Sequence, residues 1–477
     1  MKRRLPALLL SLVMLPALAQ PIELPDLGDV ASSALSAADE RTLGERIIQQ
    51  IRWRDAAYMD DAEVEAYIAR LGTRLVTASE QPHGAFEFFV IRDPSINAFA
   101  LPGGYIGLHS GLIMAAESES ELASVVGHEI AHVTQRHIAQ LFGKQGQTSM
   151  IMLASLLVAA LAANSNSQIS EAALFAGQAG AVQSQLSYTR AFEREADRIG
   201  LQVLEGAGFD VRGMPGFFER LQRLSRVYEN NAPSYLRTHP LTQERISDMS
   251  NRVQQMRYRQ VPDSDDFRFV RAKLKVGEGL ASDAIRHFEA ALADSPDDPF
   301  ARYGLARAHL RAGQLERASA ELARLNDAGV RSPFVAWLAA EVALARRQPA
   351  EAVVLVERAL AAHPDHRVLE YLLGDALLQA GEAERAVQLA RSGTLRNQQD
   401  VRFWMLAARA EAQLGRRTAH HRAQAEVYVI RGSLPAAIEQ LELARKAADG
   451  DFFEMSAVDA RMRQLKEQDM RERASRR

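Results

Sequence analysis

Two histidines and a glutamate carry the strongest chemical signal in this chain. His128 and His132 are four residues apart with Glu129 between them, which is the H-E-x-x-H pattern of metal-binding helices. On an α-helix the two imidazoles lie on one face and can bind the same ion. Zn²⁺ lowers the pKa of a bound water to about 7, and Glu129 is close enough to take its proton. The motif therefore predicts metal-assisted hydrolysis of a peptide bond.

The residues around this motif predict the helix that it needs. Apolar residues recur at helical spacing over 122–133, and Ser118 and Glu121 stand in the S-x-x-E relation of a capping box. A chance match to so short a motif is the alternative, and the helical setting argues against it. His137 lies nine residues beyond His128, about half a turn out of phase at about 100° per residue. We interpret His137 as a structural or surface residue and not as a ligand.

A catalytic zinc site takes three protein ligands and keeps one position open, so the motif needs another ligand. Glu193 and Asp197 are the best candidates, because they are four residues apart and share one face of a predicted helix. One of them can bind the metal while the other orients a histidine, and the spacing leaves open which does which. Glu195 belongs to another face. The alternative is an ordinary exposed acidic helix.

His239, Pro240 and Arg245 form a third polar group. Pro240 favours a turn or the start of a helix. Taken alone, His239 is predicted to flank the N-terminal end of that helix. No oxyanion donor is evident from the sequence, and His239 and Arg245 are the candidates for that role.

Helices and a small sheet must hold these residues in place. Residues 40–78 predict two helices. Three short strands are predicted at residues 86–91, 96–101 and 105–108. The Pro-Gly-Gly sequence at 102–104 predicts the turn before the last strand. An extended substrate can pair with a sheet edge, for which residues 97–100 are the candidate, and the alternative is that they only form core.

Two unusual segments follow the metal helix. Residues 150–162 are apolar and uncharged but fall short of the roughly 20 residues that a membrane-spanning helix needs, so they predict a buried or interfacial helix. Residues 164–187 are rich in Ala, Gln, Ser and Gly. They predict either a lid over the site or an ordinary long connection.

The first 19 residues have the organisation of a secretory signal peptide. Three basic residues precede a short apolar run, and residues 17–19 read Ala-Leu-Ala, a cleavage signal. We expect the mature chain to begin near Gln20, after cleavage at Ala19, with no transmembrane span. An uncleaved anchor is the alternative. The chain has no cysteine, which excludes disulfides and a lipid anchor after the signal, and its net charge of −3 argues against nucleic acid as a partner.

The C-terminal half carries an internal repeat of 34 residues. Two sets of small residues keep this period: Ala284, Ala318, Ala352 and Ala386, and Gly313, Gly381 and Gly415. Phe288 and Ala291 follow the first alanine at the offsets that a tetratricopeptide repeat expects. Such a period is typical of stacked helix–turn–helix units. The register weakens after about residue 418, where His420 takes the small position, and the charged residues 462–477 are expected to fray.

Together these patterns predict a mainly α protein with two domains after a signal peptide at residues 1–19. Residues 20–262 are predicted to form a zincin-like metallopeptidase domain with a small β-sheet. Residues 263–470 are predicted to form an α-solenoid of tetratricopeptide repeats.

With these motifs the chain resembles the HtpX/CaaX-protease metallopeptidase family, and within it the exported BepA-type members that carry tetratricopeptide repeats. The resemblance covers essentially the whole mature chain. It rests on the histidine motif, on the Glu-x-x-x-Asp pattern within residues 193–200, on His239-Pro240 with Arg245, and on residues 96–104.

The resemblance implies roles that the spacing leaves open. Glu193 would be the third ligand of one Zn²⁺ per chain, beside the two histidines of the motif. Asp197 would lie behind the ligands as their partner, and Glu129 would be the catalytic base. His239 would be either a fourth ligand that switches the enzyme off by displacing the catalytic water, or a group that stabilises the transition state.

The resemblance also implies a setting and two functions. The chain would work in the periplasm on misfolded or assembling outer-membrane β-barrel proteins, and its repeats would contact the barrel-assembly machinery. The leading hypothesis is a zinc endopeptidase with a chaperone-like role that degrades misfolded or stalled clients. The alternative is mainly a chaperone or assembly scaffold whose protease activity is self-inhibited through His239.

Overall fold

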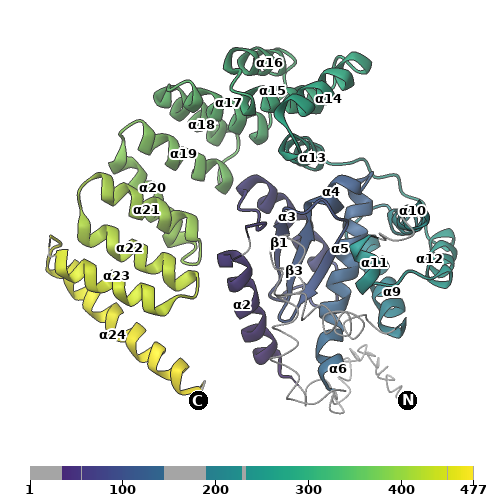
Figure 1. Cartoon of the computed structure of the whole chain (residues 1–477), viewed down its shortest axis with the longest axis horizontal. Helices are drawn as coiled ribbons and strands as arrows, with labels where there is room; N and C mark the ends of the chain where they lie inside the picture. The colour runs from purple at the N-terminus through teal and green to yellow at the C-terminus, as the bar shows by residue number, and fades with distance from the viewer. Residues whose placement is uncertain (1–34, 55, 144–189, 228–232, 448, 476–477) are drawn as a thin grey trace, which may run out of the picture.

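The chain forms an N-terminal part around a small sheet and a helical solenoid that curves beside it (Figure 1). This computed structural model describes residues 35–54, 56–143, 190–227, 233–447 and 449–475. The predicted mainly α class, the small sheet and the repeat solenoid are confirmed. The predictions for residues 1–19, 150–162 and 164–187 lie outside the described residues.

The N-terminal part contains the two helices and three strands that were predicted before the metal helix. In chain order its elements are α2 (Ala37–Arg54), α3 (Ala62–Thr77), β1 (Glu87–Ile91), β2 (Ala98–Leu101), β3 (Tyr105–His109), α4 (Ser110–Ala115), α5 (Glu119–Thr134), α6 (His137–Gly143), α9 (Arg190–Gly206), α10 (Gly213–Val227), α11 (Ser234–Thr238) and α12 (Gln243–Gln255). The H-E-x-x-H motif lies on α5, and the acidic pair lies on α9.

The sheet has the strand order β1-β3-β2. β3 pairs parallel with β1 and antiparallel with β2. The turn between β2 and β3 uses Gly103 and Gly104 at φ values of 76° and 88°, a left-handed backbone that favours glycine. Within the described residues β2 pairs on one side only, so it is an edge strand, as predicted for residues 97–100. All four of its residues are also buried, so the same strand contributes to the core.

α5 and α9 cross at a pair of glycines. A Cβ atom on Gly127 would lie 3.2 Å from the carbonyl oxygen of Gly200, and one on Gly200 would lie 3.0 Å from the backbone nitrogen of His128. The two backbones approach this closely because neither residue carries a side chain. This contact brings the acidic residues of α9 beside the histidines of α5.

The solenoid consists of paired helices that follow the predicted period. Its elements are α13 (Asp265–Gly277), α14 (Ala281–Asp294), α15 (Pro299–Arg311), α16 (Leu315–Asp327), α17 (Pro333–Ala345), α18 (Pro349–Ala362), α19 (Arg367–Gln379), α20 (Ala383–Arg396), α21 (Val401–Gln413), α22 (Arg417–Ile430), α23 (Leu434–Ala447) and α24 (Phe452–Ser475). All four periodic alanines are buried. The periodic glycines have φ values from 72° to 79°, and Arg347, at the position where the glycine series has a gap, has φ 61°.

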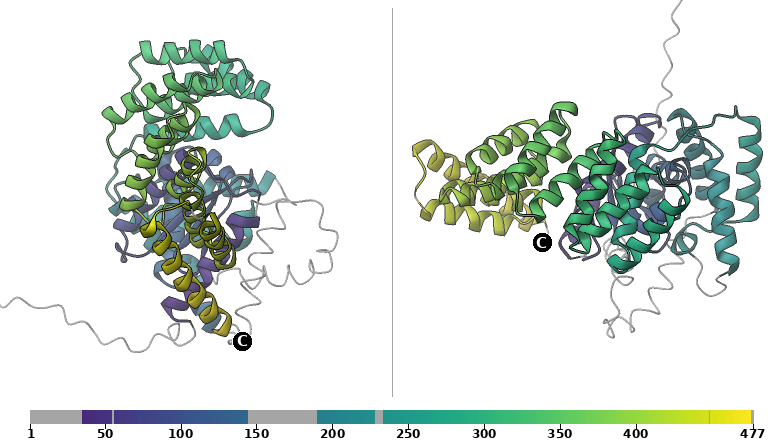
Figure 2. Two further views of the ribbon diagram at one scale, coloured as in Figure 1. Left: turned by 90° about the vertical axis from the view of Figure 1, so that its left-hand side faces the viewer. Right: turned by 90° about the horizontal axis from the view of Figure 1, so that it is seen from above.

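The solenoid contacts the N-terminal part near both of its ends. Near its start, Lys273 of α13 pairs with Glu63 of α3 at 2.5 Å, and both side chains are buried. Near its end, Trp53 of α2 donates a hydrogen bond from Nε1 to the Arg431 carbonyl at 2.7 Å. Figures 1 and 2 show the arc that returns the C-terminal helices to the side of the molecule that carries α2.

One hydrophobic core continues from α3 into the first repeats. The predicted boundary between residues 262 and 263 falls in the connection between α12 and α13, and we keep it as a proposal. The charged C-terminal end, which was predicted to fray, is helical to Ser475; Val458, Met462 and Leu465 bury the middle of α24, and none of the described side chains after Leu465 is buried. Among the described helices, none combines the length and apolarity that crossing a membrane requires.

Candidate metal centre

α5 begins at the predicted residue and is buried along almost its whole length. Ser118 is its N-cap, and the Ser118 hydroxyl accepts a hydrogen bond from the Glu121 backbone N–H at 3.2 Å. The second half of the predicted capping box differs, because the Glu121 carboxylate accepts from the Glu117 N–H at 2.7 Å. The same carboxylate pairs with Arg220 of α10 at 2.7 Å. A helix packed in this way is a rigid support for metal ligands.

Four buried side chains converge where α5, α9 and the end of α11 meet. They are His128, His132, Glu193 and His239, and one atom of each lies within 4.8 Å of the others. His132 Nε2 is 3.0 Å from His128 Nε2, and Glu193 Oε1 is 3.4 Å from His132 Nε2. His239 Nδ1 is 3.1 Å from the same oxygen of Glu193. Each of the four residues is 1% exposed.

This set of donors fits Zn²⁺. Imidazole nitrogens and a carboxylate oxygen are ligand types that zinc takes in proteins. Buried electron-pair donors this close together repel one another unless a proton or a cation lies between them. His128, His132 and Glu193 would hold the ion, and His239 lies where it can join them. The individual roles of these residues stay predictions.

Asp197 lies behind the cluster, on the far side of the His128 ring. Asp197 Oδ1 is 3.1 Å from His128 Nδ1, and Arg245 donates to both carboxylate oxygens at 2.7 Å. Burial alone would raise the pKa of Asp197, but the hydrogen bonds with Arg245 and His128 outweigh it and lower the pKa. An ionised Asp197 keeps a proton on Nδ1 of His128 and so leaves Nε2 as the metal-binding atom.

Arg245 holds two carboxylates in place. Besides Asp197, its guanidinium contacts Glu193 Oε2 and donates to the Pro240 carbonyl, both at 2.8 Å. All three guanidinium nitrogens therefore have partners, which suits Arg245 to holding these two carboxylates in position. Burial would raise the pKa of Glu193, but His239 and hydrogen bonds with the two motif histidines hold that pKa well below its usual range.

Glu129 lies beside the four converging side chains without being one of them. It is fully buried, and in the described part of the chain neither of its carboxylate oxygens accepts a hydrogen bond. His239 Nε2 approaches Glu129 Oε1 to 3.5 Å. Burial raises the pKa of Glu129, and His239 and His128 offset that rise in part. A carboxylate with a raised pKa and unused oxygens is suited to accept a proton from a water molecule.

His137 is buried, so the structural interpretation is right and the surface alternative is wrong. α5 ends at Thr134 and Arg136 has φ 52°, so the helical phase does not extend to His137. His137 Nδ1 lies 2.9 Å from His132 Nδ1, and its Nε2 lies 3.3 Å from Glu195 Oε2. This chain of contacts orients the His132 ring with Nε2 toward Glu193.

We expect His137→Ala to bind zinc about 10- to 100-fold more weakly than the wild type, because the His132 ring loses the partner that orients it. Competition with a fluorescent zinc chelator measures this affinity. His363→Ala, which removes a partly buried histidine from the repeats, is the matched control and should bind zinc like the wild type. Equal affinities for the His137 variant and the wild type would contradict the assignment.

Comparison with known proteins agrees with this geometry. Residues 62–253, which include every residue of the cluster, match Peptidase family M48, and residues 275–340 and 343–410 match tetratricopeptide repeats. The β-barrel assembly-enhancing protease of Escherichia coli strain K12 is 36% identical over 463 residues, covering 95% of this chain and 93% of the relative. The chain belongs to peptidase family M48. The protein of the same name from Yersinia pestis is 33% identical, covering 93% of this chain and 91% of the relative.

The M48 peptidase is a zinc metalloendopeptidase. A relative that shares a shorter region supports this: the mitochondrial metalloendopeptidase OMA1 of Schizosaccharomyces pombe is 32% identical over 180 residues, which cover 38% of this chain and 50% of the relative. The chemistry of this M48 peptidase therefore belongs to its N-terminal part, and its repeats serve protein interaction.

Tyr235 is a residue of the site that the sequence analysis missed. Its ring stacks on His239 with centroids 4.5 Å apart and an interplanar angle of 26°. Its backbone N–H donates to the Ile96 carbonyl at 3.0 Å, just before the edge strand β2. The signal in the sequence was the spacing of four between Tyr235 and His239, which places them on one face of a helical turn.

Proposed function

We propose that this M48 peptidase is a periplasmic enzyme that degrades misfolded or stalled outer-membrane β-barrel proteins and assists their assembly. The observation that carries the proposal is the buried cluster with Glu129 beside it, in a chain similar along nearly its whole length to β-barrel assembly-enhancing proteases. The signal-peptide pattern of residues 1–19, with cleavage between Ala19 and Gln20, supports export.

In this proposal His128, His132 and Glu193 hold one Zn²⁺, which when bound polarises the scissile carbonyl and makes water a better nucleophile. Glu129 takes the proton of the attacking water and later passes it to the leaving amine. Asp197 keeps His128 in the required tautomer. The edge strand β2 offers backbone groups with which an extended substrate can pair.

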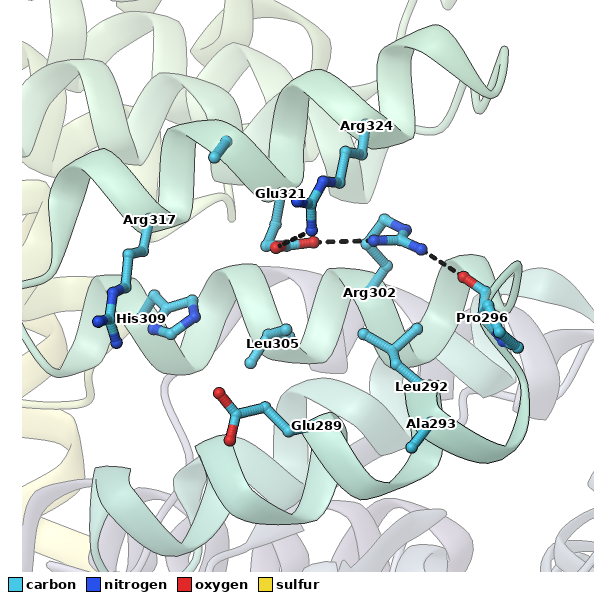
Figure 3. Close-up of a pocket in the computed structure, with 11 residues that line it drawn as sticks. Glu289, Leu292, Ala293, Pro296, Arg302, Leu305, His309, Arg317, Glu321 and Arg324 are labelled. Carbon is cyan, nitrogen blue, oxygen red and sulfur yellow. Dashed lines mark hydrogen bonds and ion pairs between the residues drawn. The ribbon is translucent and has the colours of Figure 1, made fainter.

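We assign client selection to the solenoid. A groove of about 660 Å³ lies between α14, α15 and α16. Figure 3 shows Leu292 and Leu305, which line the groove, and Arg302 and Arg324, which both bind Glu321, at 2.9 and 2.7 Å. Apolar side chains framed by charges of both signs fit an extended segment of unfolded protein. We also assign contacts with the barrel-assembly machinery to the repeats.

The proposal is tested with one β-barrel protein in two states. The zinc-loaded enzyme receives an outer-membrane β-barrel protein freshly diluted from urea, or the same protein folded in detergent micelles. We expect cleavage of the unfolded form only, and a zinc chelator should stop it. Intact unfolded substrate after prolonged incubation with the zinc-loaded enzyme would count against the proteolytic function.

One contact favours the alternative of a self-inhibited scaffold. His239 places Nδ1 against Glu193 and Nε2 against Glu129, which supports a role in which it would compete with the attacking water at the metal. We expect His239→Ala to cleave casein about tenfold faster than the wild type, equivalent to removing about 1.4 kcal/mol of inhibitory contact. His421→Ala, a half-buried histidine of the repeats that lies outside the groove, is the control. Slower cleavage with zinc retained would instead assign His239 to catalysis.

A further inference from the structure

The side chain of Tyr235 faces the metal centre from α11. This helix is a single turn in which the His239 N–H donates to the Tyr235 carbonyl at 2.9 Å. The side chains of the two residues therefore share one face, as their stacked rings show. Tyr235 is 2% exposed, so bulk water does not reach its hydroxyl.

Two unsatisfied polar groups occur together in this corner of the site. Within the described residues, the Tyr235 hydroxyl has no hydrogen-bond partner, and neither does either oxygen of Glu129. Leaving a buried hydroxyl unpaired costs stability, so native structures keep one chiefly where a ligand supplies the partner. A tyrosine hydroxyl ordinarily has a pKa of about 10, so at neutral pH it keeps its proton and can act as a donor.

The other donors of the site already have partners. Arg245 is held by Asp197 and Glu193. His239 directs one ring nitrogen to Glu193 and the other to Glu129. Tyr235 is also tied through its backbone to Ile96, next to the edge strand where a substrate would pair. Its hydroxyl lies close to Glu129, whose pKa it helps to lower, and within the described residues it makes no hydrogen bond of normal geometry.

We propose that the Tyr235 hydroxyl donates a hydrogen bond to the scissile carbonyl oxygen as negative charge develops there, which makes Tyr235 a catalytic residue. As the bond from the water oxygen to the carbonyl carbon forms, the water proton moves to Glu129 and the C=O electron pair moves onto oxygen. As the C–N bond breaks, that pair returns and the proton moves to the leaving nitrogen. Tyr235 keeps its proton throughout. This role rests on the proposed peptidase function.

Tyr235→Phe tests the proposal, because it removes the hydroxyl and keeps the ring that stacks on His239. We expect kcat to fall about 100-fold with KM within about twofold of the wild type. The affinity for a phosphinic peptide, which mimics the tetrahedral oxyanion, should fall by a similar factor in calorimetry. Zinc content and Tm should not change. Tyr303→Phe is the control, since Tyr303 is a buried tyrosine of α15 whose hydroxyl accepts from Arg307 at 3.3 Å.

Three results would overturn the role of Tyr235. They are a kcat within twofold of the wild type, a loss of zinc or of thermal stability, and a shifted acidic limb of the pH profile with an unchanged maximum. The last would mean that the hydroxyl acts on Glu129 and not on the substrate. If the wild type cleaves no substrate, the proposed function fails, and the affinity for the phosphinic peptide still decides whether Tyr235 binds a tetrahedral oxyanion.

Discussion

Glu129→Gln should keep its zinc and lose about 10³- to 10⁴-fold in kcat, because an amide cannot take a proton from water. The loss should affect the chemical step, and zinc binding and folding should not change. In the described part of the chain neither oxygen of Glu129 accepts a hydrogen bond of normal geometry, and an amide oxygen can keep the 3.5 Å approach of His239 Nε2. Burial disfavours the ionised carboxylate, as its raised pKa shows, so the neutral amide should leave the Tm equal or slightly higher.

The measurement combines turnover of a fluorogenic peptide, metal analysis and thermal unfolding of the same preparations. Glu205→Gln on α9 is the matched control, since this glutamate is exposed on a helix of the same site. Cleavage by purified Glu129→Gln at more than a tenth of the wild-type rate would remove Glu129 from the role of base.

Asp197→Ala should destabilise the protein by about 3 kcal/mol, because the buried Arg245 loses its two-pronged partner and keeps only Glu193 and the Pro240 carbonyl. The side chains of Asp197 and Arg245 are only 1% and 4% exposed, so water cannot replace the lost carboxylate. The same change frees the His128 ring, and we expect zinc affinity to fall about 10- to 100-fold.

Urea unfolding of the zinc-free and zinc-loaded variant separates these two effects, because only the second depends on metal. Asp375→Ala is the matched control, since it breaks an aspartate–arginine pair in which both side chains are about half exposed. Such a pair is worth about 0–1 kcal/mol. An Asp197 variant as stable as the Asp375 variant would contradict the structural role of the buried pair.

The sequence predicts those features of the site that depend on residues close together in the chain. His128, His132 and the cap at Ser118 depend on spacing within one helix, which side-chain periodicity reports directly. The geometry between Glu193 and the histidines depends on how α9 crosses α5, and spacing within either helix does not contain that information. The resemblance supplied the expected role of Glu193, and the glycine contact gives the physical means by which it reaches the cluster.

Extending the helical phase of α5 along the sequence failed where the backbone leaves the helical conformation. His137 was assigned from helical phase, and the left-handed Arg136 ends that phase two residues after α5. The repeats show the opposite case, because Arg347 adopts the backbone that glycine takes at the equivalent positions, so the fold continues through a gap in the pattern. Tyr235 was missed for a third reason: whether a buried donor has a partner depends on its neighbours in space, which the sequence does not state.

The glycine pair at the crossing of α5 and α9 has a practical consequence for protein engineering. A methyl group on Gly200 would press on the backbone of His128, and one on Gly127 would press on Gly200. Directed-evolution libraries that aim to change which bonds are cut should therefore leave Gly127 and Gly200 unchanged. They should vary the residues that line the groove between α14, α15 and α16 and the residues beside β2.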